Sequence, residues 1–268
     1  MSPFQKRIGI ILMGAVLSLS TAPNILAQTA TPAASVAGQE LEDAQQLREK
    51  GKYLEAHKIY AELLNRPHLN SREAHTLRGA YEDLNIQILL SGQDPDGTTT
   101  YEVLKGDSLF DLARKYQTTP ALIKKMNHLK SETIYFGKKL KLPAGTFAIQ
   151  VDRSANMLIL LRDGKPLKHY RVATGKNGAT PPGEFGIENK VENPTWYHAG
   201  TVIPHNKPEN LLGSRWLGFN TPGFGIHGTT IPESIGKAAS SGCIRMLNRD
   251  VDELYDLIPL KTKVMIKE

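Results

Sequence analysis

The sequence predicts a multidomain protein made of an α-helical hairpin, a βααβ unit and a mostly-β sandwich with one short helix. Three observations predict this division. Apolar residues recur at three- and four-residue steps over 39–95, as on the buried face of a helix. Two short helical patterns lie between strand-like runs over 99–143, and strand-like runs separated by turn residues fill 146–268. The 268 residues are enough for several small domains.

The first 27 residues have the features of a secretory signal peptide. Lys6 and Arg7 precede an apolar run over 8–19, and Ile25-Leu26-Ala27 ends in a small residue suited to cleavage. The run is shorter than the roughly 20 residues that a transmembrane helix needs, so cleavage is favoured over a membrane anchor. We therefore expect an exported protein of the periplasm, cell wall or extracellular face, which meets the membrane only transiently during export.

A predicted linker and a helical hairpin follow. Residues 28–38 are mostly Ala, Thr, Ser, Pro and Gly, which is typical of a flexible linker. Over 39–95, Arg66-Pro67 separates two helical stretches, and Gly51-Lys52-Tyr53 followed by Tyr60 resembles one tetratricopeptide-type repeat. A single repeat cannot form a solenoid, because stacked neighbours must bury its face. The hairpin is therefore interpreted as a spacer, with a partner-binding site as the alternative.

Residues 99–143 are predicted to form a compact βααβ unit. Ser108 is placed to cap one helix and Thr119 the next, with Pro120 at a first helical position, where proline is favoured. The segment carries nine Lys or Arg residues against four acidic ones. A basic surface favours an anionic partner. Because no nucleic-acid motif is present and export is expected, this partner is predicted to be a cell-envelope polymer and not a nucleic acid.

The same segment resembles a LysM domain. The residues that carry the resemblance are Tyr101-Glu102-Val103-Leu104-Lys105-Gly106-Asp107-Ser108-Leu109, Ile123 through Asn127, and Gly137-Lys138-Lys139-Leu140-Lys141-Leu142-Pro143. LysM domains bind glycans that contain N-acetylglucosamine, chiefly peptidoglycan, in a shallow groove between the first strand and the helices. The resemblance therefore implies peptidoglycan as the partner, with sugar contacts at Gly106, Asp107, Ser108 and the loop near Ile134.

The last segment, 146–268, is expected to be mostly β. Asp163-Gly164 between two strand-like runs is a strong hairpin signal, and Thr180-Pro181-Pro182-Gly183 is predicted to form a rigid turn. Residues 192–215 have few periodic signals, as in a functional flap or an irregular loop. One helix is predicted to begin after a capping Asn248. Its apolar positions are Val251, Leu254, Tyr255 and Ile258.

Cys243 is the only cysteine in the chain, which excludes an internal disulfide. A lone thiol is either a small buried apolar residue or a nucleophile activated by a nearby base. His227, sixteen positions upstream, is the candidate base. If 223–227 form a strand, Gly225 and His227 share one of its faces. A short helix over 232–239 would then return the chain to Cys243.

The turn before the thiol is suited to stabilising a developing oxyanion. Ser241, Gly242 and Cys243 could place consecutive backbone N–H groups around it, Ser240 could orient the loop, and glycine suits a strained turn. A backbone carbonyl near Gly228 could orient the base. The other seven histidines share no spacing with the candidate base, and no HExxH motif occurs. A metal site is therefore not expected.

A longer set of residues resembles the L,D-transpeptidase catalytic domain. It comprises Thr180-Pro181-Pro182-Gly183-Glu184-Phe185, Leu212-Gly213-Ser214-Arg215-Trp216-Leu217, His227-Gly228-Thr229, Ile235-Gly236-Lys237-Ala238, Ser240 through Met246, and Asp250-Val251. By this resemblance Cys243 is the nucleophile that accepts the acyl group, and His227 is the general base and acid. Enzymes of this family pass the acyl group of a tetrapeptide stem to a diamino acid of a neighbouring stem, giving a 3→3 peptidoglycan cross-link without a cofactor.

Four more positions have expected roles in this resemblance. Arg245 either holds a stem carboxylate as a bidentate fork or braces the turn after the thiol. Arg215 and Trp216 are expected to line the substrate groove. Ser241 stands where the family often has histidine, so side-chain help to the oxyanion at this position stays open.

Other activities remain as alternatives. Water as the acyl acceptor would make the enzyme an L,D-carboxypeptidase, a free D-amino acid would give exchange, and a lipoprotein lysine would give attachment of lipoprotein to peptidoglycan. Wall-hydrolysing cysteine peptidases with LysM domains usually place Cys before His, the reverse of the order found here. A non-catalytic wall-binding protein is disfavoured by the intact His227, Gly242 and Cys243.

Overall fold

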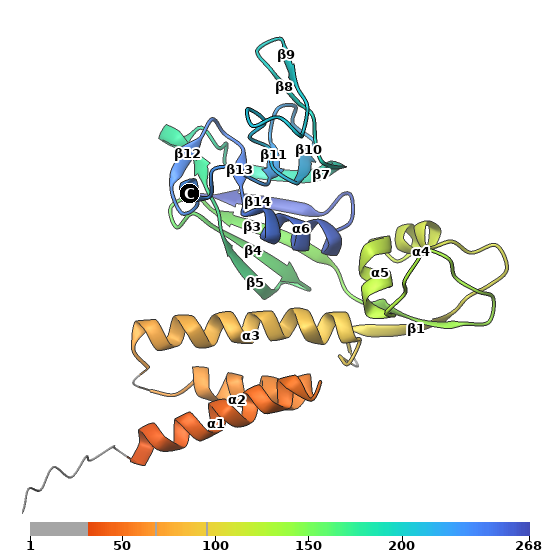
Figure 1. The fold of residues 1–268 in the computed structure, drawn as a ribbon, viewed down its shortest axis with the longest axis vertical. Helices are drawn as coiled ribbons and strands as arrows, with labels where there is room; N and C mark the ends of the chain where they lie inside the picture. Colours follow the sequence, from red (N-terminus) through yellow and green to blue (C-terminus); the bar gives the residue numbers. More distant parts are fainter. Residues whose placement is uncertain (1–31, 68, 95) are drawn as a thin grey trace, which may run out of the picture.

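The computed structural model describes residues 32–67, 69–94 and 96–268, and the predicted signal peptide over 1–27 lies outside them. The described chain forms a helical part (32–94), a βααβ part (98–143) and a sheet part (146–268), which are seen in Figure 1. Within the described ranges, no helix combines the length and the apolar character needed to cross a membrane.

The helical part contains α1 (Pro32–Glu49), α2 (Tyr53–Leu64) and α3 (Ser71–Ser91), so the predicted hairpin is a three-helix unit. Residues 32–38, predicted as linker, belong to α1, because the segment starts with a proline followed by alanines, the strongest helix formers. Side chains from all three helices form the core of the unit: Ala44, Ala56, Tyr60, Leu63, Leu77, Leu84 and Ile88.

The βααβ part has its elements in the predicted order, namely β1 (Thr98–Glu102), α4 (Leu109–Lys115), α5 (Pro120–Met126) and β2 (Lys139–Pro143), with β1 antiparallel to β2. The predicted caps are present. Ser108 Oγ accepts from the Asp111 N–H at 3.1 Å, and Thr119 Oγ1 accepts from the Leu122 N–H at 2.9 Å. Its own core contains Val103, Leu109, Leu112, Ala113, Ile123, Leu140 and Leu142.

The sheet part is built on one eight-stranded mixed sheet with the order β13-β11-β10-β7-β14-β3-β4-β5. The helix α6 (Asn248–Leu257) packs against β10 and β11. The strands are β3 (Phe147–Asp152), β4 (Met157–Arg162), β5 (Lys165–Arg171), β7 (Gly183–Glu192), β10 (Arg215–Phe219), β11 (Gly225–His227), β13 (Ile244–Arg245) and β14 (Lys263–Lys267). A hairpin of β8 (Trp196–His198) and β9 (Thr201–Ile203) rises from 192–215, the segment predicted to be a functional flap or an irregular loop.

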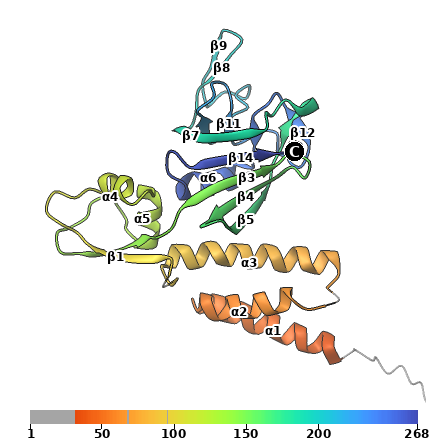
Figure 2. The same ribbon diagram turned by 180° about the vertical axis from the view of Figure 1, so that it is seen from behind.

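A single curled sheet replaces the predicted sandwich, and β7 is the reason. Residues 183–186 of this ten-residue strand pair with β14, whereas residues 187–192 pair with β10. The same strand therefore belongs to both halves, so the hydrogen-bonded ladder is never interrupted to make two sheets. The curl brings the two halves around a shared core beside α6, which Figure 2 shows from the opposite side.

Two local predictions are wrong. Residues 232–239 do not form a helix. Pro232–Ser234 is a 3-10 turn, and Ala238–Ser240 is the short strand β12, which pairs with β6 (Thr174–Gly175). Asn248 does not cap α6, since Leu247 holds the capping position without a side-chain bond. The pairing of β12 with a segment more than sixty residues earlier outweighs the weak local helix propensity.

The helical part covers the exposed edge of the sheet at β5, with α3 lying alongside this strand (Figures 1 and 2). Asn85 Nδ2 donates to the Leu167 carbonyl at 3.0 Å, and Glu82 Oε2 accepts from the His169 N–H at 3.1 Å. Lys168 adds an ion pair to Asp83 at 2.8 Å. These contacts satisfy backbone groups that an edge strand would otherwise offer to another chain.

Candidate active site

The strand register brings the two sequence-predicted catalytic residues to one face of the sheet. β11 and β13 are parallel, with Ile226 opposite Ile244 and His227 opposite Arg245. Both isoleucines are fully buried in the core. Because side chains alternate along a strand, His227, Arg245 and the preceding Cys243 belong to the opposite face. There they line a cavity of about 780 Å³ together with Trp216, Ser240, Ser241 and residues of the β8–β9 region.

His227 is buried, with only 4% of its surface exposed, and its ring is held on two sides. Its Nδ1 lies 2.6 Å from the Gly228 carbonyl oxygen, and the Trp216 ring stacks on it at 5.9 Å between centroids. A carbonyl can only accept, so Nδ1 carries the proton of the neutral ring and Nε2 is the ring nitrogen without a proton. The carbonyl at Gly228 is the orienting group that the sequence suggested.

Burial lowers the pKa of His227 to about 4, while its hydrogen bond to the Gly228 carbonyl raises the pKa and the Arg245 charge lowers it. The imidazole is therefore neutral near pH 7. Burial also raises the pKa of the Cys243 thiol, against the lowering effects of the Gly225 N–H and of Arg245. The thiol donates to the Gly223 carbonyl at 3.3 Å. The resting pair is a neutral thiol and a neutral imidazole.

The turn that precedes Cys243 is held by two hydroxyl groups. Ser240 Oγ donates to the Cys243 carbonyl at 2.6 Å and accepts from the Gly242 N–H at 3.1 Å. Thr180 Oγ1 donates to the Gly242 carbonyl at 2.8 Å and accepts from the Gly175 N–H at 2.7 Å. Ser240 and Thr180 are both buried. The predicted Thr180 turn thus supports the backbone of the cysteine loop.

One part of the predicted oxyanion site is wrong. The Gly242 N–H already donates to Ser240 Oγ, so it is not available to an oxyanion. This leaves the backbone N–H groups of Ser241 and Cys243 as candidates from the predicted turn. Gly242 adopts a φ of +138°, and a Cβ there would lie 2.9 Å from Phe224 Cε1. Glycine is required at this position by conformation and by space.

The three other predicted groove residues occupy different environments. Arg245 lines the cavity, and its buried Nε has no hydrogen-bond partner among the described residues. Trp216 lines it too, with Nε1 donating to Asn189 Oδ1 at 3.0 Å. Arg215 is not among the lining residues. Its guanidinium lies 3.4 Å from Asp252 and 5.2 Å from the centroid of the Tyr255 ring. Arg215 therefore joins β10 to α6 and does not line the substrate groove.

Asn248 is a supporting residue that the sequence analysis assigned to helix capping. Its Oδ1 accepts from the Thr229 N–H at 3.0 Å and from the Ser214 N–H at 3.2 Å. A Cβ on either Gly213 or Gly228 would collide with this oxygen. Asn248 thus clamps the turn that follows His227 to the β10 side of the cavity. The only sequence signal for this role of Asn248 is that two glycine-containing turns precede it. That signal has a meaning only once the fold has brought the two turns together.

The predicted glycan turn is stabilised by its own side chains. Asp107 Oδ2 accepts from the Leu104 N–H and from the Tyr101 hydroxyl, both at 2.7 Å. These two bonds lower the pKa of Asp107. Ser108 Oγ donates to Asp111, and Ile134 packs against the core of the βααβ part. The apolar side chains exposed on this part are Leu104, Phe110, Tyr135 and Phe136.

The described residues contain no group of three or more His, Cys, Asp or Glu side chains placed to hold a metal ion. The geometry narrows the class of site. A thiol directly before β13 and an imidazole on the adjacent strand β11, with the imidazole oriented by the Gly228 carbonyl, are the parts that acyl transfer through cysteine would need.

Comparisons with known proteins narrow this class. Residues 146–266 match the profile of the L,D-transpeptidase catalytic domain, and residues 101–143 match that of the LysM domain. YqjB of Bacillus subtilis, named as an L,D-transpeptidase, is 43% identical over 133 residues, which are 47% of this chain and 74% of YqjB. YkuD of Bacillus subtilis, also named as an L,D-transpeptidase, is 34% identical over 174 residues, covering 62% of this chain and 98% of YkuD.

Solved structures also match part of this chain. The catalytic domain of the E. faecium L,D-transpeptidase is 26% identical, with a TM-score of 0.39 over 46% of this chain and 98% of that one. On the sequence matches, this chain belongs to the L,D-transpeptidase family. It combines a transpeptidase catalytic domain of that family with a LysM domain of the peptidoglycan-binding kind.

Proposed function

We propose that the protein is a peptidoglycan L,D-transpeptidase that forms 3→3 cross-links through a Cys243 thioester, while its LysM domain holds it on the glycan. The observation that carries the proposal is the cavity that Cys243 and His227 share, with the Gly228 carbonyl accepting from Nδ1 so that Nε2 is the ring nitrogen without a proton. Family membership supplies the substrate class, and the site supplies the chemistry.

In the first half-reaction, the Cys243 sulfur attacks the carbonyl carbon of the third residue of a donor tetrapeptide. His227 Nε2 accepts the thiol proton as the S–C bond forms, because both groups start neutral. The N–H groups of Ser241 and Cys243 are the candidate donors to the tetrahedral oxyanion. The imidazolium then returns its proton to the terminal D-alanine nitrogen as the C–N bond breaks, leaving a thioester.

In the second half-reaction, the side-chain amine of a diamino acid in a neighbouring stem attacks the thioester. His227 removes a proton from this amine as the new amide forms, and the proton passes to the departing sulfur. Atoms balance without a cofactor, since the thioester conserves the energy of the peptide bond that was broken. The product is a 3→3 cross-link and the free Cys243 thiol.

Arg245 is proposed to hold a carboxylate of the donor stem. Its guanidinium lines the cavity beside the catalytic pair, and its buried Nε has no hydrogen-bond partner among the described residues. An unpaired buried donor costs free energy that a bound carboxylate would offset. Its positive charge also lowers the pKa of Cys243, which favours the thiolate formed during attack.

The site of action is proposed to be the cell wall, reached by export. A LysM domain and a transpeptidase domain in one chain support a wall-associated protein. The sequence of residues 1–27 supports a cleaved signal peptide.

The proposal is tested by incubating the protein with soluble disaccharide tetrapeptides and analysing the products by mass spectrometry. A dimer lighter by one D-alanine is expected from the wild type, and none from Cys243→Ala or His227→Ala. D-alanine release without dimers would establish a carboxypeptidase instead. A Cys243→Ala variant that keeps full activity would refute the thioester mechanism.

A further inference from the structure

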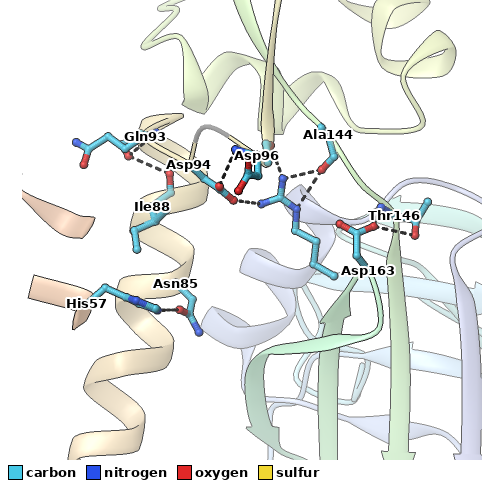
Figure 3. A network of polar contacts seen from close by, with 12 residues as sticks. His57, Asn85, Ile88, Gln93, Asp94, Asp96, Ala144, Thr146 and Asp163 are labelled. Carbon is cyan, nitrogen blue, oxygen red and sulfur yellow. Dashed lines mark hydrogen bonds and ion pairs between the residues drawn. The ribbon is translucent and has the colours of Figure 1, made fainter. Parts of the chain in front are cut away.

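The LysM domain is attached to the catalytic domain at several points, and one of them is Arg162, whose side chain is only 10% exposed. Arg162 closes β4, and its guanidinium reaches both ends of the βααβ part. It donates from Nε and Nη2 to the Ala144 carbonyl, at 3.1 and 2.6 Å, and from Nη2 to the Gly97 carbonyl. Nη1 pairs with Asp94 at 3.3 Å. One side chain thus joins all three parts of the molecule, as Figure 3 shows around Asp94 and Ala144.

The neighbouring residue completes this contact, which we name the Arg162 clasp (Asp94, Gly97, Ala144, Thr146, Arg162 and Asp163). Asp163 Oδ1 accepts from the Thr146 N–H at 2.8 Å (Figure 3). Gly97 and Gly145 leave the room that the clasp needs, because a Cβ on Gly97 would collide with Arg162 and one on Gly145 with Asp163. The clasp therefore grips the chain where it enters the βααβ part and where it leaves.

Apolar packing provides a second attachment. Leu122 and Met126 of α5 are buried, and they join the core of the sheet part together with Ile86 and Leu89 of α3. Ile123, the third buried apolar residue of α5, packs instead into the core of the βααβ part. The helix α5 therefore has one apolar face for its own domain and another for the junction.

Polar contacts from α5 to α6 form a third attachment. Lys125 pairs with Asp256 at 2.7 Å, and Thr119 Oγ1 donates to the Asp256 carbonyl. The opposite end of α6 carries Asn248, which clamps the turn beside His227. The connection between β1 and α4, which contains three of the predicted sugar contacts (Gly106, Asp107 and Ser108), extends away from the sheet part (Figures 1 and 2).

We infer that the LysM domain is a fixed mount, meaning a domain held rigidly against the catalytic domain, and not a domain on a flexible tether. The Arg162 clasp makes Arg162 a positioning residue, which sets the place of the bound glycan relative to Cys243. The enzyme then acts on peptide stems at a defined position along or beside the strand that it grips. This inference rests on the proposed function for its substrate, but the rigid arrangement itself rests on the contacts alone.

The test compares Arg162→Ala in the full-length protein with Lys165→Ala, which removes an exposed positive charge from the same hairpin. Activity is measured on soluble disaccharide tetrapeptides and on intact sacculi, with cross-links counted by mass spectrometry after muramidase digestion. Arg162→Ala is expected to lower cross-linking of sacculi at least tenfold through a higher KM, and to keep the soluble rate within twofold. Arg162→Lys should recover part of the loss, and Lys165→Ala should match the wild type.

Unchanged activity of Arg162→Ala on sacculi would overturn the inference. An equal loss on both substrates would also overturn it, because that result indicates general damage to the fold. Small-angle scattering separates the inference from the proposed function. A wild type that fits one compact arrangement, with a larger radius of gyration for Arg162→Ala, supports the mount even if the wild type forms no cross-links. Identical scattering of the two proteins would contradict it.

Discussion

The turn before the thiol and the predicted glycan turn are both built around a glycine with positive φ, +138° at Gly242 and +93° at Gly106. In each turn a side chain binds the backbone, Ser240 in one and Asp107 in the other. Their surroundings differ. A Cβ at Gly242 would lie 2.9 Å from the Phe224 ring, whereas a Cβ at Gly106 would meet nothing within 4 Å. The turn before the thiol is therefore held by the rest of the fold, and the predicted glycan turn by its own residues.

Alanine substitutions at the two glycines test this contrast most strongly. Both variants bear the cost of a left-handed φ, about 1–2 kcal/mol, but only Gly242→Ala also displaces packed neighbours. We expect Gly242→Ala to reduce kcat/KM on soluble stems at least about 100-fold, since misplacement by about 1 Å has effects of that size. Gly106→Ala is expected to leave this value unchanged. Equal values for the two variants, with circular dichroism showing both folded, would break the comparison.

Two asparagines that bind backbone groups provide a second, smaller contrast. Asn248 accepts from two N–H groups beside the catalytic cavity, and Asn127 exchanges bonds with the backbone of Lys141 at 2.7 Å in the βααβ part. Removing either side chain strands backbone groups, at a cost of about 1–3 kcal/mol in unfolding free energy. Asn248→Ala is expected to lower soluble kcat/KM about tenfold, whereas Asn127→Ala should not lower it.

Urea unfolding measures the free energy of unfolding of each variant, and steady-state kinetics measures its kcat/KM separately. If Asn127→Ala lowered the soluble rate as much as Asn248→Ala, the two parts would be coupled more closely than a fixed mount requires.

The pH dependence of kcat/KM tests the protonation state proposed for His227. His227 must be neutral to accept a proton, so kcat/KM is expected to fall as pH drops through about 4, its pKa in the folded protein. Trp216 stacks on the imidazole and helps to bury it. Trp216→Ala is expected to move this acidic limb toward pH 6.5, the ordinary histidine pKa. Trp216→Phe keeps an aromatic ring and should keep the limb near the wild-type position.

This prediction is tested by measuring kcat/KM against pH for the wild type, Trp216→Ala and Trp216→Phe. If the acidic fall of kcat/KM did not move in Trp216→Ala, Trp216 would be assigned to substrate contact alone. The same burial affects stability. The unfolded chain takes up a proton on His227 below about pH 6.5, whereas the folded chain resists it down to about 4. Stability should therefore decrease as pH falls through this window.

The local elements were predictable where short-range chemistry decides them. The caps at Ser108 and Thr119 depend on residues three positions away, and both form as predicted. Alternation over a predicted strand 223–227 put Gly225 and His227 on one face; the strand β11 begins only at Gly225, and Ile226 between them lies in the core. The sandwich was wrong because β7 joins both halves of the sheet, and no local signal marks a strand that changes partner midway.

The sequence alone is enough to identify the reactive groups of the protein and to show which of them stand together in one motif. A lone thiol, a histidine upstream of it and a glycine before it suffice for that, because turns and alternation are set by neighbours along the chain. How these groups are used depends on the tertiary structure. In it the Gly242 N–H donates to Ser240, Arg215 pairs with Asp252 of α6, and Arg162 binds the carbonyl of Ala144. The contacts of Arg215 and Arg162 join residues far apart in the sequence, so they exist only once the curled sheet has brought its segments together.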